Sequence, residues 1–285
     1  MTTVSIWIQG ARPRTLPAAI APVLVASSLA GSDFNWFRAA LALKVAIWLQ
    51  IGVNFANDYS DGIRGTDSDR VGPTRIVASG LASAQAVKRA AFVSFFIAGI
   101  AGLILASMTS WWLIAIGAVA MFAAWAYTGG KSPYGYSGYG EISVFIFFGL
   151  VATMGSFYVQ TETITIASFI VAVPVGCIAC ALLAINNIRD REKDALFGKR
   201  TLAVRLGDRN SRNFFVALLV IAHTAALLTL TPWALITLAL LPLTFRLSKL
   251  VRSDRQGLAL IPLLAKTGQL QLLFAGLFAT ALWLS

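Results

Sequence analysis

Long apolar runs follow one another along the whole of this 285-residue chain. Each run is close to the roughly 20 residues that an α-helix needs to cross a bilayer, and short polar stretches separate the runs. The pattern predicts about nine spanning helices. We place them at residues 15–32, 38–57, 87–108, 110–128, 141–159, 164–188, 212–230, 232–250 and 257–284. In an alternative interpretation, the seventh and eighth runs form one hairpin that is interrupted at Pro232.

The composition places most of the chain in lipid. Hydrophobic residues make up 58% of the sequence and charged residues only 12%, which is more apolar than a soluble domain of this length can bury. We therefore expect residues 1–285 to form one integral membrane domain, and the fold class to be an all-α, polytopic bundle.

Basic residues are distributed asymmetrically. A net charge of +11 in a soluble protein would favour a nucleic-acid partner, but nine spans place nearly all the Lys and Arg residues on one side. Only Arg38, Lys44 and Lys266 fall elsewhere. The positive-inside rule then predicts a multi-pass protein of the cytoplasmic (inner) membrane, with a cytoplasmic N-terminus and an external C-terminus. No nucleic-acid partner is expected.

Two local patterns admit a second interpretation. The first apolar run resembles a cleaved signal peptide, although Pro13, Pro17 and Pro22 and the many later spans favour a retained helix. Cys177 and Cys180 have the C-x-x-C spacing of redox or metal sites, yet they stand inside an apolar run. Packing of small residues between helices is the favoured interpretation of this pair.

Carboxylates collect at two predicted helix ends on the cytoplasmic side, in residues 54–69 and 186–194. The spacing i, i+4 and i+7 or i+8 puts each set on one helix face. Carboxylates so close together near hydrocarbon need a compensating cation, and hard oxygen ligands favour Mg²⁺, Mn²⁺ or Ca²⁺ over Zn²⁺. Mg²⁺ also binds substrate phosphates. We therefore predict a metal-diphosphate site from Asn54, Asp58, Asp61, Asn186, Asp190 and Asp194. Solvated helix ends paired with Lys and Arg are the alternative.

Further side chains near these motifs have the chemistry to contact a diphosphate. Glycines permit a turn after the second motif, where Lys199 and Arg200 are able to approach phosphate oxygens. We add Asn57 and Arg64 beside the first motif to the predicted diphosphate-binding set, which also includes Asn54 and Asn186. The positive-inside rule alone also accounts for basic residues at these positions.

Residues 127–141 contain four tyrosines between the fourth and fifth runs. Their rings are able to stabilise an allylic cation while the loop excludes water from the site. We predict a catalytic role for Tyr134 and an acceptor contact for Tyr136. An interfacial aromatic belt is the alternative explanation.

The two motifs resemble the Asp-rich motifs of the UbiA superfamily of intramembrane aromatic prenyltransferases, and the resemblance runs nearly end to end. The first motif departs from the usual N-x-x-x-D-x-x-x-D, since Gly62 occupies its last place and Asp61, Asp67 or Asp69 must complete the metal shell. Several stretches are most similar to the branch that prenylates 1,4-dihydroxy-2-naphthoate in menaquinone synthesis. They are residues 11–18, 57–61, 70–75, 134–136, 141–145 and 198–202.

This resemblance implies a nine-helix bundle around a central cavity with a cytoplasmic cap, and Mg²⁺ as the cofactor. It implies transfer of a polyprenyl chain from a prenyl diphosphate to dihydroxynaphthoate, with loss of CO₂ and diphosphate, giving demethylmenaquinone. Asp58, Asp61, Asp190 and Asp194 take the catalytic roles that the motifs have in the family. Arg14 and Arg75 lie in the branch-specific stretches, and a planar Arg fork binds carboxylates well, so we expect them to contact the acceptor.

Other interpretations stay open at this point. Relatives within the superfamily that act on 4-hydroxybenzoate, homogentisate, haem or chlorophyllide share the Asp motifs, and a phytyl donor is compatible with them. A transporter also has polar residues among broken helices, but its acids should lie at mid-membrane. A purely structural subunit would leave the two carboxylate faces without a purpose.

Overall fold

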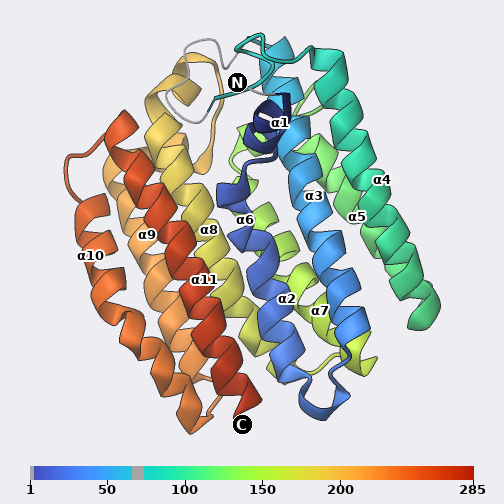
Figure 1. Ribbon diagram of the computed structural model, residues 1–285. Helices are drawn as coiled ribbons and strands as arrows, with labels where there is room; N and C mark the ends of the chain where they lie inside the picture. Colours follow the sequence, from blue (N-terminus) through green and yellow to red (C-terminus); the bar gives the residue numbers. More distant parts are fainter. Residues whose placement is uncertain (1–2, 66–73) are drawn as a thin grey trace.

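The computed structural model describes residues 3–65 and 74–285, and over these ranges it is a bundle of helices with no strand. The long helices run side by side along one common direction (Figure 1). The first half contains α1 Thr3–Ala11, α2 Pro17–Leu29, α3 Trp36–Ile63, α4 Ala84–Met108 and α5 Leu113–Ala126. The second half contains α6 Gly140–Val144, α7 Ala152–Thr161, α8 Ile166–Leu196, α9 Leu202–Leu227, α10 Leu241–Val251 and α11 Ile261–Trp283.

Short segments with other helical geometries join some of these helices. A π-helical segment, Phe145–Val151, links α6 to α7, so that residues 140–161 form one continuous rod. A 3-10 segment, Pro232–Leu240, leads into α10, and Pro232 begins it, in agreement with the preference of proline for the first turn of a helix. A second 3-10 segment, Gly257–Leu260, leads into α11.

The all-helical bundle predicted from hydropathy is confirmed. Among the described residues, six helical segments are long and apolar enough to cross a membrane, while α2 and α5 are apolar but shorter. The six are residues 36–63, 84–108, 140–161, 166–196, 232–251 and 257–283. Two of them, α3 and α8, extend well past the predicted ends at residues 57 and 188, so both acidic motifs lie on helix.

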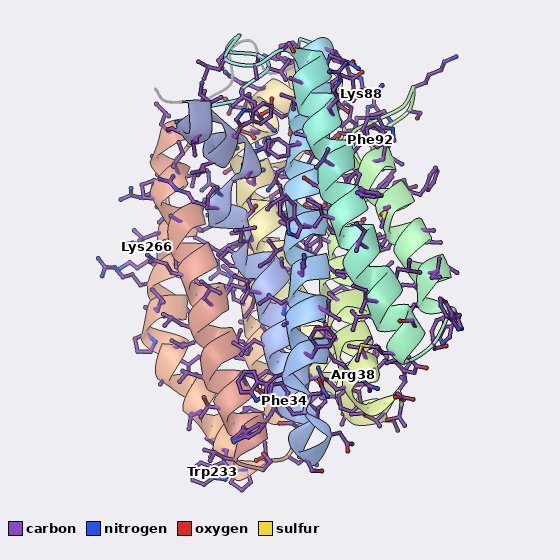
Figure 2. The ribbon with its side chains drawn as sticks, turned by 45° about the vertical axis from the view of Figure 1, so that its right-hand side comes forward. Phe34, Arg38, Lys88, Phe92, Trp233 and Lys266 are labelled. Carbon is purple, nitrogen blue, oxygen red and sulfur yellow. The ribbon has the colours of Figure 1, made fainter. Side chains whose placement is uncertain are left out.

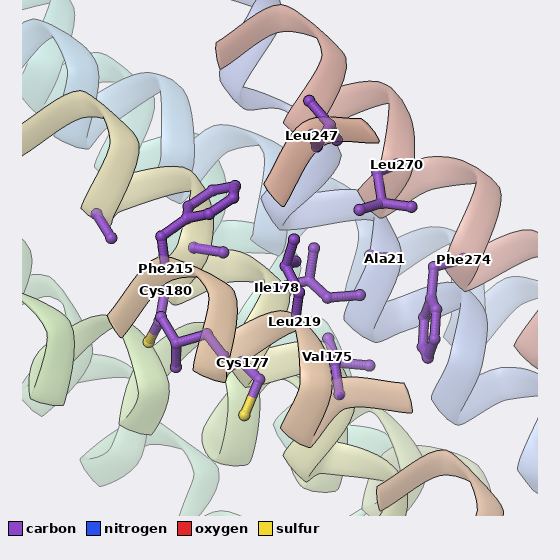
Figure 3. Close-up of a cluster of buried hydrophobic side chains, with 14 of the residues drawn as sticks. Ala21, Val175, Cys177, Ile178, Cys180, Phe215, Leu219, Leu247, Leu270 and Phe274 are labelled. Atoms are coloured by element: carbon purple, nitrogen blue, oxygen red, sulfur yellow. The ribbon is translucent and has the colours of Figure 1, made fainter. Parts of the chain in front are cut away.

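Helix α8 lies at the centre of the main hydrophobic core. Its residues Val175, Ile178 and the two cysteines pack against α9, α10, α11 and α2 (Figure 3). Cys177 and Cys180 are buried and free, as helix packing requires. Small residues permit a close contact between α8 and the π-helical segment: a Cβ atom on Gly149 would lie 2.7 Å from the Cα of Gly176.

Two arginines cap helix C-termini at opposite ends of the bundle. At the end away from the acidic motifs, the Arg38 guanidinium donates to the carbonyls of Met108 at 3.1 Å, Val159 at 3.1 Å and Gln160 at 3.3 Å. It also pairs with Glu162 at 2.9 Å (Figure 2 labels Arg38). The last carbonyls of a helix have no partner within the helix, so one cation satisfies the ends of both α4 and α7.

Arg212 does the same at the motif end. This 5%-exposed side chain donates to the carbonyls of Ser253 at 2.9 Å and Arg255 at 2.7 Å, and to that of Val251 at 2.5 Å. Its Nε also bonds Asp208 at 2.7 Å. Arg212 thereby ties α9 to the connection between α10 and α11.

Lys266 behaves differently from these two arginines. Its side chain points away from the bundle (Figure 2), and no described residue forms an ion pair or hydrogen bond with it. A lysine on a lipid-facing helix surface extends its ammonium group toward the headgroups, so it needs no partner within the protein.

We expect Arg38→Met to lower the melting temperature of the detergent-solubilised protein. The substitution leaves helix-end carbonyls unsatisfied, and each charged hydrogen bond of this kind contributes about 1.5–3 kcal/mol. Lys44→Met, at an exposed position of the same helix, is the matched control and should change the melting temperature little. Equal melting temperatures for the two variants would contradict the capping role.

Candidate active site

Two cavities meet at the bundle end where α3 and α8 terminate. The larger has a volume of about 690 Å³ and the smaller about 130 Å³. Six residues line both of them: Arg12, Asn57, Arg75, Tyr127, Leu183 and Asn186. The two cavities are therefore neighbouring compartments with a shared wall.

The smaller cavity brings the two acidic motifs together. Asn57 and Asp61 of α3 line it together with Asn186, Asp190 and Asp194 of α8. The motifs are separated by more than a hundred residues of sequence, and their oxygen donors meet only through packing of the bundle. Lys193, Lys199 and Tyr136 also line this compartment.

Asp61 has three described polar partners at the smaller cavity, Lys199, Arg75 and Tyr136. It is 4% exposed, its Oδ1 lies 3.1 Å from the Lys199 Nζ, and its Oδ2 lies 3.4 Å from an Arg75 Nη2. The Tyr136 hydroxyl donates to the same Oδ1. Burial, and then the negative charge of Asp61, raise the pKa of Tyr136, so its hydroxyl keeps the proton that it donates.

Asp190 is held by its neighbour in the chain. Arg189 binds it through two parallel bonds, Nε to Oδ1 at 2.8 Å and Nη2 to Oδ2 at 2.7 Å. The Arg189 side chain is 1% exposed. On the preceding turn, the Asn187 amide donates to Glu141 Oε1 at 2.9 Å, which fixes α8 against α6. Arg189 and Asn187 carry no sequence signal of their own, because Arg beside Asp is an ordinary pair at a helix end.

The Asp58 carboxylate accepts hydrogen bonds from backbone N–H groups. Its two carboxylate oxygens accept the N–H groups of Ile76 at 3.1 Å and Val77 at 3.0 Å, and an Arg12 Nη2 lies 3.8 Å away. Asp58 is 0% exposed and lines neither cavity. These hydrogen bonds hold Ile76 and Val77 against α3.

Asn54 also has bonding partners outside the smaller cavity. Its amide donates to the Ala11 carbonyl at 2.8 Å and to the Thr15 hydroxyl at 2.9 Å, and the residue lines only the larger cavity. Asn57 and Asp61 line the smaller cavity from α3, as Asn186 and Asp190 do from α8. Asp67 and Asp69, two of the candidates to complete the first motif, lie outside the described residues.

The predicted acceptor residues do not share one compartment. Arg14 is exposed and lines the larger cavity, Tyr136 lines the smaller one, and Arg75 lines both. Of the predicted phosphate contacts, Lys199 reaches a cavity wall, whereas Arg64 and Arg200 do not.

Arg64 and Arg200 instead hold the tyrosine-rich loop. The Arg64 guanidinium donates to the carbonyls of Thr128 and Gly130, and its charge lies 5.5 Å from the ring centre of Tyr136. The backbone N–H of Arg200 donates to the Tyr136 carbonyl at 2.7 Å. Both contacts position Tyr136 over Asp61.

Tyr134 lies at the polar end of the larger cavity. Its hydroxyl donates to the Ala123 carbonyl at 2.9 Å and lies 2.9 Å from Ser143 Oγ. Its ring meets that of Tyr127 edge-on, with centres 5.5 Å apart. Burial raises the pKa of both phenols, so neither is an anion at neutral pH.

The rest of the larger cavity is an apolar channel. It follows α3, α5 and the 140–161 rod away from the motifs, and small residues leave room in its walls. Nothing lies within 4 Å of a Cβ atom built on Gly117 or Gly155. The apolar lining includes Ala42, Val45, Ala46, Leu49, Leu105, Leu113, Ile116, Ala120, Phe147, Phe148, Val151, Ala152 and Val159.

The donor set of the smaller cavity fits a magnesium ion shared with a phosphate ligand. Its lining offers carboxylate and amide oxygens and neither His nor Cys, which suits a hard cation. Across the described residues, no three acidic, His or Cys side chains converge into a ready-made cage. Mg²⁺ characteristically uses one or two carboxylates with water and substrate phosphates, so an incomplete protein shell suits it.

Comparisons with known proteins identify the family of the chain. The profile of the UbiA prenyltransferase family matches residues 19–260. A protein named 1,4-dihydroxy-2-naphthoate octaprenyltransferase from Mycobacterium tuberculosis is 48% identical, over 99% of this chain and 98% of that protein. One of the same name from Escherichia coli is 37% identical, over 98% and 95% of the two chains.

Solved structures show the same fold at low sequence identity. The structure of a UbiA homolog from Archaeoglobus fulgidus bound to GPP and Mg²⁺ has a TM-score of 0.68 with 14% identity, and the match covers 98% of this chain and 100% of that one. The match to the family profile covers most of the sequence, and two relatives exceed 30% identity over nearly their full lengths. The chain therefore belongs to the UbiA prenyltransferase family.

Proposed function

We propose that this chain transfers a polyprenyl group from a prenyl diphosphate to 1,4-dihydroxy-2-naphthoate, with release of diphosphate and CO₂. The observation that carries the proposal is the polar compartment between the two motifs, which opens on a long apolar channel. A prenyl diphosphate has the same two parts, an anionic head and an apolar tail. The names of the relatives supply the acceptor.

Asn57, Asp61, Asn186, Asp190 and Asp194 are the residues that would hold Mg²⁺. A bound Mg²⁺ neutralises charge on the diphosphate and makes it a better leaving group. Solved homologues bound to GPP or DMAPP together with Mg²⁺ support this use of metal in the fold.

Lys199 and Arg75 supply further positive charge to the leaving group. Both lie against Asp61 and line the smaller cavity, so their charges are concentrated where the diphosphate binds. Preorganised charge of this kind stabilises the transition state because it needs no reorganisation during the reaction. Tyr136 holds Asp61 in place by donating its hydroxyl proton.

The reaction balances without an oxidant. The allylic C–O bond breaks with its electron pair on the diphosphate oxygen, and the electron-rich naphthoate ring attacks the allylic carbon. The C–C bond to the carboxylate then breaks, CO₂ leaves, and that electron pair stays in the ring. The product is accordingly at the hydroquinone level, as demethylmenaquinol, and a later oxidation gives demethylmenaquinone. The rings of Tyr127 and Tyr134 face the larger cavity's polar end, where they stabilise allylic positive charge.

We place the chain in the cytoplasmic membrane as one domain of nine spans, with the motif end on the cytoplasmic side as a cap. The positive-inside rule supports this orientation. Nine helical rods match the nine apolar runs, if α2, α5 and α9 are counted with the six longer segments. The tail of the donor then enters from lipid, and the soluble acceptor enters from the cytoplasm.

Purified protein supplied with dihydroxynaphthoate, a polyprenyl diphosphate and Mg²⁺ should form a prenylated naphthoquinol that mass spectrometry detects. Parallel reactions with 4-hydroxybenzoate and homogentisate test the acceptor. Faster turnover of either alternative acceptor would overturn the proposed function.

We expect Asp61→Asn and Asp190→Asn to lower kcat/KM by at least about a hundredfold, because each removes a metal ligand and leaving-group stabilisation. Excess EDTA should abolish turnover of the wild type. Mg²⁺ with inorganic diphosphate should raise the melting temperature of the wild type but not of these variants. Undiminished activity in EDTA would exclude a metal requirement.

Asp58→Asn should instead lower the stability of the protein without affecting its response to Mg²⁺ and diphosphate. An Asn oxygen accepts one of the two backbone N–H groups and leaves the other unsatisfied, which costs about 1–3 kcal/mol. Its melting temperature should therefore fall, while Mg²⁺ with diphosphate still raises that temperature by the wild-type increment. Loss of the increment at unchanged stability would instead make Asp58 a metal ligand.

Topology is testable with single cysteines in a Cys177→Ala/Cys180→Ala background. A cysteine at Asn210 should react with an impermeant maleimide only from the cytoplasmic side, and one at Thr163 only from outside. The two positions lie at opposite ends of the bundle, at the start of α9 and between α7 and α8. Labelling of both from the same side would contradict the nine-span orientation.

A further inference from the structure

The polar end of the larger cavity carries cations without matching acids. Four arginines line it, namely Arg12, Arg14, Arg75 and Arg189, and no Asp or Glu among the described residues does. The smaller cavity has a mixed character, since three aspartates line it together with Arg12, Arg75, Lys193 and Lys199. The two compartments therefore differ in their charged groups: the described carboxylates line only the smaller one. The smaller one suits a metal with its diphosphate, and the larger one suits an organic anion.

The four arginines differ in their exposure and in the cavities that they line. Arg12, like Arg189, has one buried nitrogen without a hydrogen-bond partner, but it lines both cavities. Arg12 lies 3.8 Å from Asp58, and Arg75 lies 3.4 Å from Asp61 at the shared wall. Arg14 is exposed at the surface. Arg189 lines the larger cavity only.

Arg189 is buried and incompletely satisfied. The residue is 7% exposed, and its Nε and Nη2 both bind Asp190. Its third nitrogen, Nη1, is buried and has no hydrogen-bond partner. A buried donor of a charged group normally has a partner, and an unsatisfied one is costly. A ligand oxygen in the larger cavity, which Arg189 lines, is able to be that partner.

We propose that Arg189 binds the carboxylate of the aromatic acceptor and thereby selects aryl carboxylates over neutral phenols. The inference rests on the proposed function for the identity of the reaction. Asn186, one turn earlier on α8, lines both cavities, so the acceptor site adjoins the diphosphate site along a single helix. Tyr127 and Tyr134 line the same cavity and offer ring faces for the aromatic body of the acceptor.

A single hydrogen bond from the Arg189 Nη1 suits an acceptor carboxylate that leaves as CO₂ during the reaction. A bidentate pair would hold the carboxylate strongly, and loss of CO₂ would then have to break both bonds. A single charged bond binds the ground state and is lost as the negative charge moves into the ring. An interaction present only in the ground state lowers the acceptor KM and kcat by the same factor and leaves kcat/KM unchanged.

The test compares two ligands that differ only in the carboxylate, 1-hydroxy-2-naphthoate and 1-naphthol. Their dissociation constants are measured without a prenyl donor, by thermal shift or calorimetry on the detergent-solubilised full chain. The wild type should prefer the carboxylate by about tenfold to a hundredfold, which is the range for one charged hydrogen bond. Arg189→Gln should lose most of this preference while its affinity for 1-naphthol stays unchanged.

Two further variants separate a carboxylate contact from a structural role. Arg209→Gln removes an exposed arginine that lines neither cavity, and it should retain the preference for the carboxylate. Arg189→Lys keeps the charge but cannot serve Asp190 and the ligand at once, so it should restore the preference only in part. It also tests the proposal if Arg189→Gln does not fold.

Two outcomes would overturn the inference: a full carboxylate preference in Arg189→Gln, or equal weakening of both ligands, which indicates a residue that only positions Asp190. Failure of the proposed function is a separate result, because it would appear as absence of prenylated naphthoquinol in the wild type.

Discussion

The structure depends on how its carboxylates are neutralised at a helix end beside hydrocarbon. Acidic side chains that converge near lipid repel one another, and the bundle compensates each with a different partner. Asp61 has Lys199 and Arg75, Asp190 has Arg189, and Asp58 has two backbone N–H groups. Arg189 is the chain neighbour of Asp190, whereas Lys199 lies 138 residues from Asp61 and the partners of Asp58 lie 18 and 19 residues away. The charge balance therefore positions the tyrosine loop, the second motif and residues 75–77 around one another.

The same charge balance divides the site into two compartments. Aspartates and cations alternate around the smaller cavity, whereas the polar end of the larger cavity is lined by arginines and tyrosines and its remainder by Ala, Gly, Val and Leu. A diphosphate ester of a long isoprenoid has to cross from one environment to the other. Arg12, Asn57 and Asn186 stand at the shared wall, where the bond between head and tail would lie.

Hydropathy predicted an all-helical bundle, but it could not fix which face of α3 lines the smaller cavity. Positions 54, 58 and 61 lie on one face of a helix, but positions 57 and 61 do as well, because i+3 and i+4 neighbours overlap. Packing decides between them: Asn54 and Asp58 turn to the backbone of neighbouring segments, and Asn57 lines both cavities. The second motif leaves a similar choice, because Asn187 is spaced three and seven residues from Asp190 and Asp194, and both Asn186 and Asn187 line the smaller cavity.

Arg189 illustrates the other limit of sequence reasoning. In the sequence it is one basic residue among many on the side that topology makes basic. Only burial separates it from its neighbours, because a side chain 1% exposed must find partners for all its donors inside the protein. Two of those donors bind Asp190, so this arginine links a predicted metal ligand to the arginine-lined compartment. A substrate oxygen on its remaining nitrogen would draw the guanidinium toward the larger cavity and weaken its hold on Asp190. The carboxylate of Asp190 would then be more available to a metal, so binding of acceptor and metal should be coupled through a single side chain.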